Sequence, residues 1–364
     1  MEENNTFINL TNDNGLIELF YIKIGSTWAI DTINLFIMCP FALFTSVLNL
    51  MSFQAFRKIK VQKSGIRNYF KIYSIAAFSF CAISLSGFLT RSPRLINVIF
   101  SYWCGLFRCK INIYQSTFYF FTNLLDCIII MERLINFHTS FTEKFKFLNH
   151  SNVVCLATFL TTSTLSIANF FFYNIRDNSE FVEAIKSYEI LQSFTYCRRV
   201  KSNFNAELLI LLLLIIRDFL PLILEIILSV LLIKYFKVYL DERKRILYSN
   251  KKKKSNHLLS MHIVYRIANN SHSVDIKFKE KISNLENYNT KLTKMILWMS
   301  FCSILSHIGA SYYYIIFMIY DNSLLAHSSL IIANCFILVK YATNFFFIYY
   351  FNGNFKKYIN KFFL

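Results

Sequence analysis

Glycine, acidic residues and enzyme motifs are scarce in this chain of 364 residues. The seven Gly are scattered, so the sequence contains no Gly-rich loop of the kind that cradles phosphates. It contains no H-E-x-x-H and no Cys-x-x-Cys, and no metal-ligand spacing connects His138, His150, His257, His262 and His272. These absences exclude common nucleotide-binding and metalloenzyme motifs, and we expect neither an enzyme nor a bound cofactor.

Charged residues make up only 16% of the chain, whereas 55% of its residues are hydrophobic. A soluble domain could not easily bury so much apolar surface, so the composition favours a membrane protein. A spanning helix needs roughly 20 mostly apolar residues. Seven stretches qualify: 27–56, 69–90, 110–136, 153–174, 206–236, 292–320 and 327–351.

We therefore predict an all-α membrane protein, with a seven-transmembrane helix bundle over 27–351 between a tail at 1–26 and a segment at 352–364. The second and fourth stretches are the weakest, because Ser and Thr dilute them. The acidic start has no basic segment followed by an apolar core and a cleavage site. We therefore expect no signal peptide, and the first helix should direct insertion.

The basic residues predict the orientation, because loops rich in Lys and Arg stay in the cytoplasm. They lie in three segments, which we place inside: Arg57, Lys58, Lys60, Lys63, Arg67 and Lys71; Arg243 to Arg245 and Lys251 to Lys254; and Lys356, Lys357 and Lys361. The N-terminus is then outside. The long basic loop at 237–291 should be partly disordered, with short helical extensions. The net charge of +18 should attract anionic membrane lipids; nucleic-acid binding is the weaker interpretation.

Three cysteines fall on the predicted outer face, which is oxidising. Cys109 and Cys197 would form a disulfide that ties the second outer loop to the third helix, with Cys104 as the competing partner. Asn4 and Asn9 head N-x-[ST] sequons in the outer tail, where we expect glycosylation.

Several short motifs follow one another at the predicted membrane faces. They are Asn49 in the first helix, Glu132-Arg133-Leu134 at the inner end of the third, Phe219-Leu220-Pro221-Leu222 in the fifth, and Asn344 followed by Phe355-Lys356-Lys357. In order and spacing the chain resembles a divergent rhodopsin-like G-protein-coupled receptor. The resemblance implies that Glu132, Arg133, Asn344, Pro221 and Asn49 act in switching and in coupling to a heterotrimeric G protein. It also implies a short amphipathic eighth helix after Phe351.

The sequence departs from the family pattern at several positions. Ser79 aligns with the Asp that helps to hold sodium, His307-Ile308-Gly309 replaces W-x-P, and Phe345 and Ile348 replace the Pro and Tyr of N-P-x-x-Y. The fourth helix lacks the family's Trp. These departures imply either altered switching or a receptor that has lost signalling.

Ionisable residues are costly inside a bilayer, so those within the helices carry most information about mechanism. Asp126 lies seven residues before Arg133 on the same helix face, and Lys340 lies one turn before Asn344. We predict that Asp126 and Lys340 pair; the alternative is that each faces a water-filled cavity. No acid is placed to latch Arg133 from the sixth helix, so its partner should be Glu132 or Thr293, unless Arg133 reaches the lipid headgroups.

Candidate ligand contacts lie at the usual depth of the family's cavity. They are Arg217 and Asp218 on the fifth helix, Tyr114, Gln115 and Tyr119 on the third, and His307, Tyr312 and Leu338 on the last two. Arg217 and Asp218 could equally form a structural ion pair, and the aromatic residues could be core packing. The family's retinal-bearing lysine would align with Leu338 rather than Lys340, which disfavours a light receptor.

We therefore expect a plasma-membrane receptor for an extracellular peptide or small chemosensory molecule. The alternatives are a seven-helix channel or transporter and a structural membrane protein without a ligand. A transporter should show repeated halves, and the sequence shows neither such repeats nor glycine-broken helices.

Overall fold

The computed structural model describes residues 32–59, 65–90, 101–137, 145–176, 196–199, 212, 215–258, 269–320 and 324–363. For 101–110, 167–176, 196–199, 243–258 and 269–286 it describes the backbone alone. The predicted glycosylation sites Asn4 and Asn9 and the predicted outer tail at 1–26 lie outside the described residues. The side chains of Cys104, Cys109 and Cys197 do as well, so the predicted disulfide stays a prediction.

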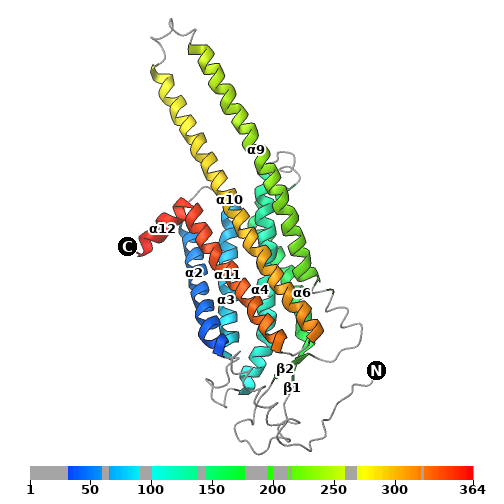
Figure 1. Ribbon diagram of the computed structural model, residues 1–364. Helices are drawn as coiled ribbons and strands as arrows, with labels where there is room; N and C mark the ends of the chain where they lie inside the picture. Colours follow the sequence, from blue (N-terminus) through cyan, green and yellow to red (C-terminus); the bar gives the residue numbers. More distant parts are fainter. Residues whose placement is uncertain are drawn as a thin grey trace, which may run out of the picture.

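Long helices that lie side by side dominate the described structure (Figure 1). They are α2 (Cys39–Lys58), α3 (Gly65–Thr90), α4 (Ser101–Ile135), α6 (Ser151–Phe172), α9 (Leu220–Leu258), α10 (Asn269–Tyr320) and α11 (Leu324–Phe351). The π-helical turns η1 (Asn34–Met38) and η5 (Ile215–Phe219) lead into α2 and α9, and η3 (Lys146–Asn149) precedes α6. Helix α12 (Gly353–Phe363) follows α11 and turns away from it (Figure 1).

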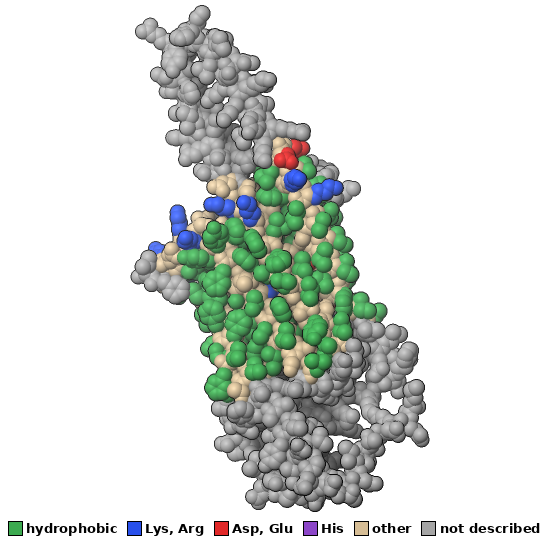
Figure 2. Space-filling model, viewed as in Figure 1, with side chains coloured by type: hydrophobic (Ala, Val, Ile, Leu, Met, Phe, Trp, Pro, Cys, Tyr) green, Lys and Arg blue, Asp and Glu red, His purple; other side chains and the backbone are tan. Residues whose placement is uncertain are grey.

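Five helices in the described residues are long and apolar enough to cross a membrane: Asn34–Lys58, Gly65–Leu89, Ile215–Glu242, Asn289–Tyr313 and Ser328–Phe351. The other two predicted spans correspond to α4 and α6. In α4, Gln115, Asn123 and Asp126 interrupt the apolar sequence, and in α6 only the residues up to Ser166 have described side chains. Apolar side chains cover the outside of the bundle in the view of Figure 2. Val153, Val230 and Phe36 are 66%, 60% and 71% exposed.

Two features differ from the sequence-based expectation. Strands β1 (Tyr173–Arg176) and β2 (Tyr196–Arg199) pair antiparallel, with Ile175 opposite Cys197, so the described fold is not purely helical. Helical extensions were expected within 237–291, and the described extensions are longer than expected. Helix α9 runs on to Leu258 and α10 begins at Asn269, so both project far beyond the bundle (Figure 1).

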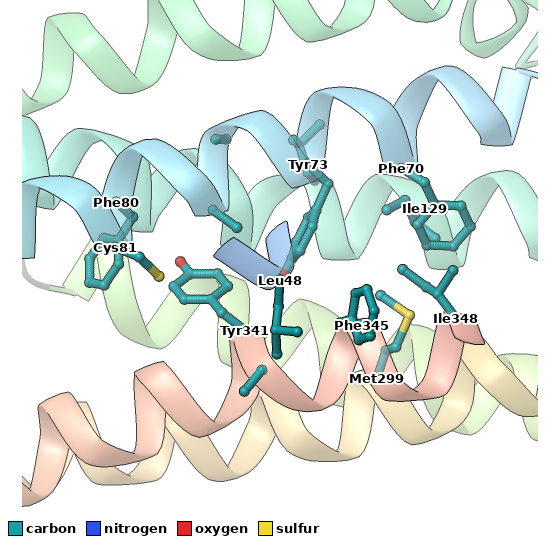
Figure 3. Packing of buried hydrophobic residues seen from close by; sticks show 14 of the residues in the cluster. Leu48, Phe70, Tyr73, Phe80, Cys81, Ile129, Met299, Tyr341, Phe345 and Ile348 are labelled. Carbon is teal, nitrogen blue, oxygen red and sulfur yellow. The ribbon is translucent and has the colours of Figure 1, made fainter. Parts of the chain in front are cut away.

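Aromatic rings fill the core between α2, α3, α11 and α12. Tyr341 packs against Tyr73 and Phe80, with ring centroids 6.2 and 5.2 Å apart. Figure 3 shows these rings between the helices, beside Phe345 and Ile348. The ring of Phe355 on α12 lies 5.4 Å from that of Phe56 and 5.6 Å from that of Phe345. These contacts anchor α12 to the bundle, while Lys356, Lys357 and Lys361 on the same helix remain exposed.

Gly309 allows α10 and α11 to approach closely where the resembled family has a proline. A Cβ atom added at Gly309 would lie 2.8 Å from Cδ2 of Phe336. Since this is well inside contact distance, any larger residue would push the two helices apart or force the ring to move.

We predict that Gly309→Ala lowers the free energy of unfolding by about 1–3 kcal/mol, because overpacking forces the backbone or the ring to shift. Thermal unfolding of the purified protein in detergent would measure this. Gly87→Ala on α3 is the matched control, since an added Cβ there meets nothing within 4 Å. Phe336→Leu should restore part of the loss. Equal effects at the two glycines would show that the close approach is unimportant.

Candidate functional site

A buried ion pair joins α4 to α11 at the centre of the bundle. Lys340 Nζ lies 2.7 Å from Asp126 Oδ2, and the two side chains are 0% and 4% exposed. Lys340 Nζ also donates to Asn123 Oδ1 at 2.9 Å, and Ser303 Oγ on α10 donates to Asp126 Oδ2 at 3.2 Å. The contact expected from the sequence is thus present, and it includes a third helix.

Neither charge of this pair could be buried alone at an acceptable free energy. An isolated charge removed from water costs several kcal/mol or more, and pairing offsets that cost only when hydrogen bonds satisfy the remaining polar atoms. Asn123 and Ser303 supply such bonds. The pair therefore favours one arrangement of α4, α10 and α11 over others.

We predict that Asp126→Asn and Lys340→Met each destabilise the protein by about 3–5 kcal/mol, because each leaves one buried partner without its counter-charge. The double variant should lose much less than the sum of the two single losses. Thermal unfolding in detergent provides the readout, with the exposed Lys356→Met as the control for loss of a lysine. Additive losses would mean that the two groups do not interact.

Asp126, one member of this ion pair, also takes part in a row of three polar contacts between α4 and α10. Tyr119, Asp126 and Arg133 recur every seven residues on α4 and therefore share a face. Each meets a polar side chain of α10: Tyr119 Oη lies 3.5 Å from His307 Nδ1, Ser303 donates to Asp126, and Arg133 Nε donates to Thr293 Oγ1 at 2.9 Å. Buried polar groups thus line the contact between the two helices along about two turns in each direction from Asp126.

Arg133 forms the contact of this row that lies nearest the projecting part of α10. Besides its bond to Thr293, Nη2 donates to the Asn289 carbonyl at 2.7 Å, and the guanidinium carbon lies 4.8 Å from the centre of the Phe137 ring. Only 4% of Arg133 is exposed. Of the two partners considered from the sequence, Thr293 contacts Arg133 here. The neighbouring Glu132 keeps one carboxylate oxygen, Oε2, buried without a hydrogen-bond partner among the described residues.

The two motif asparagines connect α2, α3 and α11. Asn49 Nδ2 donates to the Thr45 and Tyr341 carbonyls at 2.9 and 3.4 Å, and Asn344 Nδ2 donates to Tyr73 Oη at 2.7 Å. Ser79 was predicted to join the internal polar network of Asp126 and Lys340, and the bond described for it lies within α3. Its hydroxyl donates to the Ile75 carbonyl of its own helix at 2.9 Å, since the buried face of α3 runs through Tyr73, Ala77 and Phe80 instead.

Some ligand candidates contact other residues of the bundle, and two are exposed. Arg217 and Asp218 form an ion pair of 2.7 Å, and Arg217 also donates to Ser116 Oγ at 2.9 Å, so the structural alternative considered from the sequence is present. Gln115 donates to Ser84 Oγ at 3.0 Å, and Leu338 is buried in the core. Tyr114 and Tyr312 are 62% and 47% exposed, so their role as ligand contacts stays a prediction.

Sequence reasoning did not place Glu225 in a site, although a glutamate in an apolar helix was the available signal. Its side chain is 0% exposed, and Oε2 lies 3.7 Å from Nε2 of His307, which is also 0% exposed. Beside them, Ser229 and Ser300 share a hydrogen bond of 2.6 Å. Pro221 is buried one turn before Glu225, and its carbonyl accepts from Cys127 Sγ at 3.6 Å.

Among the described residues, His, Cys, Asp and Glu side chains do not gather in groups of three that could hold a metal ion. Apolar helices with an apolar exterior around buried ionisable groups define a multi-pass helical membrane protein. No protein-family model matches the sequence, and no curated protein matches it.

Proposed function

We propose that this chain is a seven-crossing receptor of the rhodopsin-like type, which binds an extracellular ligand and activates a heterotrimeric G protein. In this proposal α2, α3, α4, α6, α9, α10 and α11 cross the plasma membrane, and α12 is the eighth helix along its inner surface. The contact of Arg133 with Thr293 and Asn289 carries the proposal.

The charge distribution supports a cytoplasmic placement for this contact. Exposed Lys and Arg side chains gather at one end of the apolar belt in Figure 2, the end from which α9 and α10 project. They include Arg57, Lys58, Lys234, Lys237, Lys291, Lys294, Lys356 and Lys357. By the positive-inside rule this end faces the cytoplasm, and the end that carries β1 and β2 faces outward.

The Arg133 contact has the properties of a closed latch. It fixes the inner part of α10 against α4 through a charge-assisted hydrogen bond, the kind that contributes most. Movement of α10 away from α4 would break this contact and expose both the guanidinium and the space beneath it. A G protein that binds only the open form would then shift the population towards it.

A ligand would act at the opposite end of the same helices. Arg217, Asp218, Gln115, Tyr119 and His307 contact one another or their neighbours in the outer half of the bundle. Since Tyr119 and His307 form one of the three polar contacts between α4 and α10, a ligand that separates them would alter the row that ends at Arg133. Polar groups of both charges suit a peptide or a small polar chemosensory molecule.

Thr293→Val should raise ligand-independent G-protein activation by roughly tenfold. The substitution keeps the side-chain shape but removes a hydrogen bond to a charged group, which contributes about 1.5 kcal/mol, and this difference favours the open form. A cell-based second-messenger assay at matched surface expression would measure the change.

Thr161→Val is the matched control for this substitution, because Thr161 is exposed on α6 and its hydroxyl bonds to the Ala157 carbonyl of its own helix at 2.9 Å. It should leave basal activity unchanged. Basal activity that is the same for wild type, Thr293→Val and Thr161→Val would contradict a latch at Arg133.

The proposed function itself is tested by expression with promiscuous G-protein reporters, screened against peptide and small-odorant libraries. Arg133→Ala should abolish agonist responses while surface expression persists, because the residue would no longer be available to the G protein. Agonist-evoked currents that persist when G proteins are blocked would favour a channel instead.

A further inference from the structure

Glu225 and His307 form a buried acid and base pair between α9 and α10, and the receptor proposal gives Glu225 no role. Both side chains are 0% exposed, and 3.7 Å separates Glu225 Oε2 from His307 Nε2. The Ser300 and Ser303 hydroxyls lie near the Glu225 carboxyl group. By hydrogen-bond geometry, however, neither Glu225 oxygen has a partner among the described residues, and the same holds for His307 Nε2. A buried ionised carboxylate without such bonds is very costly.

The neighbouring charges do not remove this cost. The charged and titratable groups that act on the pair are Tyr119, Asp126 and Cys127 from α4, Tyr73 from α3 and Lys340 from α11. Lys340 is the cation among them, and it already contacts Asp126 at 2.7 Å. An ionised Glu225 would therefore add a second negative charge to a site that holds one positive charge.

We infer that Glu225 binds a proton in this closed arrangement, so that a neutral carboxylic acid and a neutral imidazole face each other between α9 and α10. The O–H bond forms on a carboxylate oxygen of Glu225, and the proton comes from water. His307 is the nearest base and can accept this proton when the helices separate.

The direction of the pH dependence follows from this placement. A hydrated glutamate is ionised at neutral pH, whereas the closed bundle has no spare positive charge to meet an ionised Glu225. The closed arrangement is therefore fully stabilised in acid and loses stability as the pH rises, because the deprotonated carboxylate would face Asp126. Deprotonation thus favours separation of α9 and α10. Its consequence for signalling rests on the proposed receptor function, but the protonation does not.

Infrared difference spectroscopy on the full-length protein in detergent tests the protonation directly. At neutral pH the wild type should show the carbonyl stretch of a protonated carboxylic acid, and Glu225→Gln should lose that band. In the wild type, the temperature of the unfolding midpoint should decrease as the pH rises from about 5 to about 8. It should fall much less in Glu225→Gln, whose amide mimics the neutral acid.

Glu242→Gln is the matched control, because Glu242 lies on the same helix and is exposed. It should keep both the band and the pH dependence. Absence of the band in the wild type, or its persistence in Glu225→Gln, would overturn the inference. If Glu225→Gln does not accumulate, Glu132→Gln removes the other glutamate with a buried oxygen: the band should persist, and its loss would assign the proton to Glu132 instead. None of these readouts requires an agonist or a G protein.

Discussion

Hydrocarbon solvates neither backbone polar groups nor charges, and this constraint organises the whole structure. It requires the chain to satisfy its backbone within helices and to place apolar side chains on the outside. Ionisable groups inside the belt must then meet one another, as Lys340 and Asp126 do at 2.7 Å. In water the same pair would contribute little, since exposed salt bridges are weak. Within the bundle it determines which faces of α4, α10 and α11 can be in contact.

The row of polar contacts between α4 and α10 makes a mechanical account of signalling possible. Apolar packing alone would hold the two helices together without distinguishing one end from the other. Tyr119 with His307, Asp126 with Ser303 and Arg133 with Thr293 give the contact discrete positions that can be made or broken. A perturbation near His307 and a partner near Arg133 would act on the same two helices, which is the physical requirement for coupling between distant sites.

Much of this arrangement follows from one-dimensional patterns. Apolar runs of membrane length located the helices, and spacing by seven residues placed Asp126 and Arg133 on one face. The partners across helices were harder to predict, because they depend on rotation of each helix about its axis. Ser79 was assigned to the polar network by counting along α3, but the face that α3 buries lies about one residue away, through Tyr73, Ala77 and Phe80. The length of the extensions of α9 and α10 was underestimated, because the polar composition of 237–291 does not show how far a solvated helix continues.

The proposed receptor function depends on the sidedness of the chain, because a latch at Arg133 could meet a G protein only from the cytosol. The most direct measurement is an epitope-tag study in intact and permeabilised cells. Tags would be placed at the N-terminus, within 259–268 and at the C-terminus, with glycosylation acceptors in the remaining loops to count the crossings. The account predicts that the N-terminal tag is reached in intact cells, that the other two require permeabilisation, and that the chain crosses seven times. An N-terminus in the cytosol, or any other number of crossings, would contradict it.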